Sequence, residues 1–211
     1  MAKTKGRKVR HVLEALAAFF LLIIQYVPVV GIWHGVMFFP LAVYLFSLLV
    51  TYPETFWTDA NFLLFSPHSI FGRVVAFCGF ALFLVACFHF LRGHKKLITT
   101  GLYSVVRHPQ YLGIIVLTYG YSFMLIQVTT TPHIEIVRNV LFIWLIQVLG
   151  YIALASYEEH RLLHEYENEY QQYKHKVPFI FPVSHPSRIP EPIFSFILAL
   201  IIAFLCALLI V

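Results

Sequence analysis

Two polar stretches in an otherwise apolar chain hold the residues that could do chemistry, and the first is built around Arg107, His108 and Pro109. Proline disfavours helix at the residue before it and is tolerated in the first helical turn, so Pro109 is expected to begin a helix. Arg107 and His108 would then lie beside free backbone N–H groups and the positive end of a helix dipole. That setting favours an anion, such as the carboxylate of a small cofactor. The alternative is an arginine that snorkels to the interface beside a histidine that caps the helix.

The second stretch begins at Glu158 and Glu159, which follow an apolar run without an intervening Gly or Pro. The helix is therefore expected to continue past the membrane. A carboxylate at the membrane boundary is unfavourable unless it has a partner or a function, which makes Glu158 a candidate site residue. A solvated helix start is the alternative. His160 and His164 have the spacing of two metal ligands on one helix face, but no motif supplies a third, so no metal site is expected.

The composition indicates that transmembrane helices position these two polar stretches. The chain is 60% hydrophobic and 12% charged, with a mean hydropathy of +0.79, whereas soluble domains carry about 25% charged residues. Runs near the ~20 residues that span a bilayer recur along the chain. The prediction is an all-α membrane protein with about six transmembrane helices. These helices are expected at residues 11–31, 32–50, 70–91, 111–128, 136–157 and 192–211.

This pattern predicts three parts: N-terminal transmembrane helices (1–91), a central core with a helical hairpin (92–190) and a C-terminal transmembrane helix (191–211). The hairpin brings both polar stretches to one membrane face. Each stretch carries four Lys or Arg, so the positive-inside rule places them in the cytoplasm. Five basic residues among the first ten conflict with the outside position that three preceding spans would give the N-terminus. The net charge of +5 is assigned to the lipid surface, because no nucleic-acid module is present.

Two shorter features accompany the polar stretches. Gly101 permits a turn or a close backbone approach ahead of Arg107. Pro178 and Pro182 bracket three apolar residues, which predicts an extended segment lying back against the helices.

In combination, these pieces resemble the isoprenylcysteine carboxyl methyltransferases and their relatives, the phospholipid methyltransferases. The likeness lies in the order and spacing of short motifs over residues 94–182. The residues that carry it are Thr99, Gly101, Tyr103, Arg107, His108, Pro109, Tyr111, Gly113, Glu158, Glu159, Leu162, Tyr170, Tyr173, Val177, Pro178 and Pro182. One departure concerns the acceptor. Family members that methylate prenylcysteine carry an arginine where this chain has Leu154, four residues before Glu158.

The resemblance implies an S-adenosylmethionine-dependent membrane methyltransferase. Its cofactor pocket would be cytoplasmic, built from the segments after the third and fifth helices, and would face a lipophilic or small acceptor. The residues that the resemblance places at the cofactor are Lys95, Lys96, Leu97, Ile98, Tyr103, His108, Pro109, Gln110, Tyr111 and Glu158. Arg107 and Glu159 are expected to support the cofactor or the substrate, and the catalytic residues stay unassigned.

Two other hypotheses remain open. A membrane reductase of the sterol-reductase type has a similar architecture but uses NADPH, whose phosphates call for several arginines. A non-catalytic membrane protein or small transporter is the third hypothesis. Transporters commonly carry charges inside their helices, and these helix interiors hold almost none.

Overall fold

The computed structural model describes residues 32–53, 65–92, 97–128, 134–184, 186 and 188–210, and every regular element among them is a helix. The chain divides into two compact units, residues 1–39 and 40–211. In the first unit the described part is the short helix α2 (Ile32–Met37). The second unit holds the residues on which the chemistry depends and is described by itself below. The division into residues 1–91, 92–190 and 191–211 stays a prediction.

The helix predicted at residues 32–50 is divided in the structure into α2 and α3 (Phe39–Thr51). The break lies at Phe38, whose N–H donates to Gly35 O at 3.2 Å, a bond over three residues in place of four. Pro40 explains it, because its ring clashes with the carbonyl four residues earlier and it has no N–H to donate. The helix predicted at residues 11–31 lies outside the described residues.

Four described helices are long and apolar enough to cross a membrane. They are α6 (Ile70–Arg92, extended by the 3₁₀ turn η2 at Pro67–Ser69), α7 (Pro109–Val128), α8 (Ile134–Lys176) and α9 (Glu191–Ile210). Each begins within three residues of its predicted position, and α7 begins at Pro109 itself. The apolar stretch 35–51 is shorter than these four. The described residues thus hold four candidate transmembrane helices, as expected for a helical integral membrane protein.

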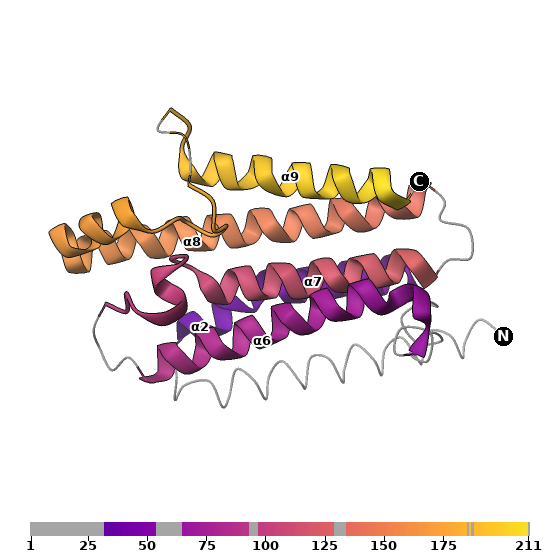
Figure 1. Ribbon diagram of the computed structural model, residues 1–211, viewed down its shortest axis with the longest axis horizontal. Helices are drawn as coiled ribbons and strands as arrows, with labels where there is room; N and C mark the ends of the chain where they lie inside the picture. The colour runs from indigo at the N-terminus through magenta and orange to yellow at the C-terminus, as the bar shows by residue number, and fades with distance from the viewer. Residues whose placement is uncertain are drawn as a thin grey trace. The chain divides into compact units, whose positions relative to one another are not determined.

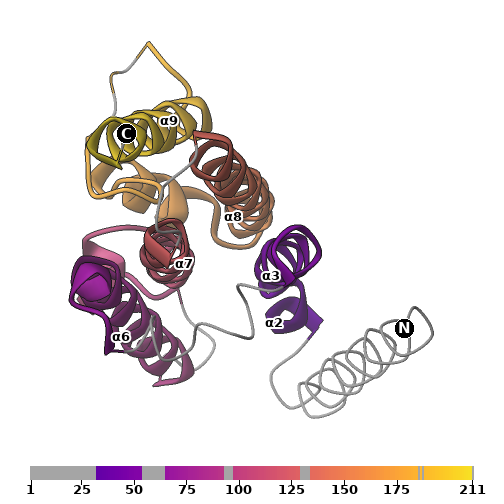
Figure 2. The ribbon, with the colours of Figure 1, turned by 90° about the vertical axis from the view of Figure 1, so that its right-hand side faces the viewer.

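Within the second unit, α7 lies between α6 and α8, and α9 runs alongside α8 (Figures 1 and 2). The α6–α7 contact is the most extensive and depends on glycine. A Cβ on Gly79 would lie 2.2 Å from Leu117 N, and one on Gly113 would lie 2.6 Å from Phe83 N. Backbones this close pack by van der Waals contact, which drives helix association in lipid. α3 joins the bundle through Tyr44, whose hydroxyl donates to Thr118 O at 3.1 Å.

The far end of α8 reverses direction. Glu167 has φ 35° and ψ −110°, so the 43-residue element is two helices joined at that residue. The side chains of Glu159 and Lys174 meet at 2.8 Å, although fifteen residues of straight helix would separate their backbones by about 22 Å. Leu162, Leu163 and Tyr166 pack against Tyr170, Tyr173 and Val177 across the bend. The helix therefore continues past its apolar part, as predicted, but folds back onto itself.

Candidate functional site

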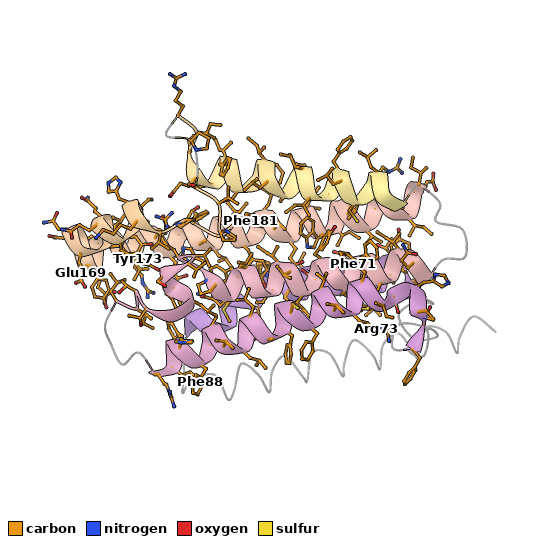
Figure 3. The ribbon with its side chains drawn as sticks, viewed as in Figure 1. Phe71, Arg73, Phe88, Glu169, Tyr173 and Phe181 are labelled. Atoms are coloured by element: carbon orange, nitrogen blue, oxygen red, sulfur yellow. The ribbon has the colours of Figure 1, made fainter. Side chains whose placement is uncertain are left out.

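The two polar stretches meet at one end of the second unit. Tyr173 donates its hydroxyl hydrogen to Tyr103 O at 2.5 Å, and Arg107 N–H donates to Pro178 O at 2.9 Å. Figure 3 shows Tyr173 and Phe181 at this end, with Phe71 and Arg73 toward the other. The predicted hairpin of α7 and α8 therefore brings together the segments that follow α6 and α8.

A tight turn presents the first stretch to the site. Gly101 has φ +65°, the left-handed conformation that glycine adopts without strain. A Cβ there would lie 2.7 Å from His89 Nε2, so glycine also gives room to that ring. The 3₁₀ turn η3 (Gly101–Ser104) follows and directs Tyr103 inward, where its hydroxyl donates to Gln110 Oε1 at 3.0 Å. Burial raises the pKa of Tyr103, so its hydroxyl stays protonated and serves as a donor.

Arg107 lies at the centre of a buried ion network. Its guanidinium is fully buried. It pairs through Nε with Glu159 Oε1 at 2.9 Å, through Nη2 with Glu191 Oε2, and through Nη1 with the carbonyl of Lys174 at 3.2 Å. Lys174 Nζ in turn lies 2.8 Å from Glu159 Oε2 and 3.7 Å from Glu191 Oε2. The network joins the segment before α7, both halves of α8 and the first residue of α9.

His108 lies between the two glutamates. Its Nδ1 is 3.4 Å from Glu158 Oε2 and its Nε2 is 3.5 Å from Glu159 Oε1. These distances are long for hydrogen bonds and define ion pairs. The Tyr111 ring stacks on the imidazole at 5.5 Å between centroids, and the Phe179 ring meets it edge-on at 5.4 Å. Burial alone lowers the pKa of His108, but the contacts and charges of Glu158 and Glu159 outweigh it, and the pKa lies above its ordinary value.

The neighbouring glutamates have different surroundings. The Glu159 side chain is 6% exposed, and that of Glu158 is 29% exposed. Glu158 Oε2 accepts from the Tyr111 hydroxyl at 3.1 Å and faces His108. Burial is the largest single influence and raises both carboxyl pKa values, but the hydrogen bonds and charges that lower them, led by His108, together outweigh it. The pKa of Glu158 is lowered, with help from Tyr111, and that of Glu159 is lowered to about 2, with help from Arg107 and Lys174. Both are ionised at neutral pH.

The predicted residues divide into three groups. His108, Tyr111, Glu158, Arg107 and Glu159 form one cluster, and Pro109, Gln110 and Tyr103 are buried beside it. Leu97 packs against the Tyr170–Tyr173–Val177 cluster, and Ile98 is half-buried. Lys95 and Lys96 lie outside the described residues. The extended segment 177–182 lies against the helices as predicted, with Phe179 and Ile180 buried.

Lys174 and Glu191 belong to the network although the sequence did not single them out. The sequence could have indicated Glu191, because it is a carboxylate at the start of an apolar helix, where an unpaired charge is unfavourable. The sequence holds no such indication of Lys174, because its place depends on the reversal at Glu167.

The fold and this site define an integral membrane protein with a charged, buried cluster at one end of its helices. The chain belongs to the DUF1295 family, described as proteins of unknown function, which it matches over residues 30–177. It is also similar to protein-S-isoprenylcysteine O-methyltransferase B of Arabidopsis thaliana, with 29% identity over 85 residues. That match covers 40% of this chain and 39% of the relative's length. The resemblance drawn from the motifs is confirmed. No solved structure matches the chain.

Proposed function

We propose that this protein is an integral membrane methyltransferase that transfers a methyl group from S-adenosylmethionine to a lipophilic acceptor. The observation that carries the proposal is the meeting of His108 and Tyr111 with Glu158 at one end of the helices. The plant relative, whose name describes a methyltransferase, supports it. Because the match covers 39% of that relative, the activity is inferred from the site and the shared segment together.

The residues present fit the proposed donor. S-adenosylmethionine carries a sulfonium, an ammonium and a carboxylate, so its site needs an anion and further polar atoms. Glu158 offers a partly exposed carboxylate. The two buried ring nitrogens of His108 have no well-formed hydrogen bond among the described residues. Buried polar atoms are usually bonded, so such nitrogens are suited to a ligand.

When bound, the donor would supply an electrophilic methyl group, and the protein would supply orientation. Glu158 would hold a cationic group of the donor, while the Tyr111 hydroxyl orients the Glu158 carboxylate. Phe179, edge-on to His108, would exclude water on that side. Alignment of acceptor and donor contributes to the rate through proximity, which reaches about 7–11 kcal/mol in ideal cases. Tyr103 and Gln110, bonded to each other, would shape the wall, and Lys95, Lys96, Leu97 and Ile98 would complete it.

The proposal includes a topology. Six helices would cross the membrane, and the pocket formed by the segments after α6 and α8 would face the cytoplasm. The basic residues of both polar stretches support that orientation.

The acceptor is proposed only as a lipophilic or small molecule that reaches the site from the bilayer or the cytosol. Leu154 occupies the position of the arginine that serves the carboxylate in prenylcysteine methyltransferases, and its apolar side chain cannot pair with that group. An acceptor without a carboxylate fits this chain better.

Arg107 also favours the methyl donor over NADPH. A phosphate-bearing cofactor would need an available guanidinium, whereas that of Arg107 is buried and paired with Glu159 and Glu191.

The direct test is isothermal titration of the detergent-purified protein with S-adenosylhomocysteine, with NADPH as the comparison. We expect binding of the first and none of the second. Circular dichroism on the same sample establishes that it is folded. A folded protein that binds only NADPH, or neither compound, would contradict the proposal.

A further inference from the structure

The charged cluster contains equal numbers of opposite charges when His108 is protonated. It holds three cations and three carboxylates. These are Arg107, His108 and Lys174, and Glu158, Glu159 and Glu191. Because most of these groups are buried, a charge added without compensation would carry a large desolvation cost.

The position of His108 favours an imidazolium. Both ring nitrogens face carboxylate oxygens, at 3.4 and 3.5 Å, and the residue is 2% exposed. A neutral imidazole has one nitrogen with a lone pair and no hydrogen. That lone pair would face a carboxylate in either tautomer, which is repulsive. An imidazolium, which carries a hydrogen on each nitrogen, is therefore the form that suits this arrangement.

The other charged groups near His108 are paired with one another, so Glu158 is the carboxylate that a cationic ligand could bind. Glu159 is held by Arg107 and Lys174 as well as by His108, and Arg107 is held by Glu191 on its other side. Tyr111 packs on one face of the imidazole, and the segment after α8 contributes the uncharged Phe179. Glu158 lies 3.4 Å from His108 through its Oε2, and the positive charge of Arg161, three residues further along α8, also acts on it.

We propose that His108 is the resident counter-ion of Glu158, and that a cationic group of the ligand takes its place with release of the proton from His108 Nδ1. This inference deepens the proposed function and rests on it. The Nδ1–H bond breaks, its electron pair stays on nitrogen and the proton passes to solvent. Nε2 keeps its hydrogen toward Glu159, so the cluster and the ligand's cationic group together carry the net charge that the cluster carried before binding.

The ligand cation is either the sulfonium or the ammonium of the amino-acid part, and four ligands distinguish them. S-adenosylmethionine and sinefungin carry a cation at the sulfur position and an ammonium. S-adenosylhomocysteine carries the ammonium with its carboxylate. Methylthioadenosine carries neither cation.

The experiment is titration calorimetry of the unmodified protein in pairs of buffers with different ionisation heats, at pH values of about 5.5 to 7, below the range where α-amino groups titrate. The difference in observed heat gives the protons released per ligand bound. We expect up to one proton for the cationic ligands and none for methylthioadenosine. The affinity for the cationic ligands should rise up to about tenfold per pH unit while His108 is protonated in the free protein.

Release with S-adenosylmethionine and sinefungin alone would assign the sulfonium position, and release with S-adenosylhomocysteine as well would assign the ammonium. His108→Gln should remove both the release and the pH dependence, whereas the control His164→Gln, at an exposed position on α8, should change neither. Binding of every cationic ligand without proton release would overturn this inference and leave the proposed function standing. Failure of all four ligands to bind folded protein would instead contradict the proposed function.

Discussion

At the residue scale, neighbouring glutamates take up different tasks because α8 turns them toward different partners. Glu159 is nearly enclosed and is shared by Arg107, Lys174 and His108. Glu158 is more exposed and contacts Tyr111 and His108. Sequence alone presents a Glu-Glu pair, and the structure buries the second in the ion network and leaves the first partly exposed, at the position proposed for the ligand.

Substitution by glutamine should separate the two tasks. Glu158→Gln removes the negative charge at the proposed ligand position, and we expect at least tenfold weaker binding of S-adenosylhomocysteine with little loss of stability. Glu159→Gln removes one of the two carboxylates that pair with Arg107 and Lys174 and leaves Glu191 as the other, which should reduce the free energy of unfolding by about 3 kcal/mol. Titration calorimetry and unfolding in detergent measure the two effects. Glu135→Gln, at an exposed site at the other end of α8, is the matched control. Equal effects of the two substitutions on binding and stability would contradict this division.

Acid should weaken the fold through Glu159. Its pKa falls from 4.5 to about 2 in the folded protein. The stabilisation is therefore fully present above pH 4.5 and is lost as pH falls from there toward 2. The difference between these two pKa values corresponds to a stabilisation on the order of 3 kcal/mol. The apparent unfolding temperature of the native protein should drop through this range, whereas that of Glu159→Gln should drop less. Parallel curves for the two proteins would show that other groups dominate the acid response.

At the element scale, α6 and α7 form a rigid pair because glycines let their backbones approach. Gly79, Gly113 and Gly120 each lie against backbone atoms of the facing helix. The pair holds η3 and the start of α7 in place, and so positions Tyr103, Arg107 and His108. The site depends on this packing although it lies at the end of the helices.

One methyl group should disturb the pair. In Gly79→Ala the new Cβ would meet Leu117 N at 2.2 Å, and backbone cannot move aside as a flexible side chain can. We expect a loss of about 1–3 kcal/mol, as for other overpacked substitutions. Gly35→Ala is the control, since a Cβ there meets nothing within 4 Å, and alanine is the better helix former. Thermal unfolding of both variants in the same detergent measures the difference. An unchanged Gly79→Ala protein would mean that the helices are not packed this closely.

Some features of the helices follow from local sequence, and others depend on contacts between distant residues. Pro109 and Gly101 act through their own backbone preferences, so the start of α7 and the turn before it were predictable. The division of residues 32–50 by Pro40 followed from the same chemistry but was missed, because the apolar run is continuous. The reversal at Glu167 has no local signal, since a glutamate at positive φ is held by contacts across the bend. Lys174 reaches the site only through that reversal, so its role could not be predicted, whereas Glu191 could have been noticed as a carboxylate at the start of an apolar helix.

At the scale of the whole molecule, the arrangement of the helices predicts which residues lie on which side of the membrane. α6 begins after η2 and ends before η3, so Ser104 and His68 lie beyond opposite ends of one membrane-spanning helix. Gln171, on the returning half of α8, belongs to the same end as Ser104, because Tyr173 bonds to Tyr103. If the proposed orientation is right, Ser104 and Gln171 face the cytoplasm and His68 faces away from it.

Cysteine labelling tests this orientation in native membranes. After Cys78, Cys87 and Cys206 are replaced by alanine, single cysteines are introduced as Ser104→Cys, Gln171→Cys and His68→Cys, all at exposed positions. A membrane-impermeant maleimide should label the first two in inside-out vesicles and the third in right-side-out vesicles. Labelling of Ser104→Cys and Gln171→Cys from opposite sides would show that the two polar stretches lie on different sides of the membrane, and it would contradict the site. Labelling of both from the outside would be consistent with the site but would reverse the proposed orientation of the protein in the membrane. The soluble donor would then have to be supplied outside the cytoplasm.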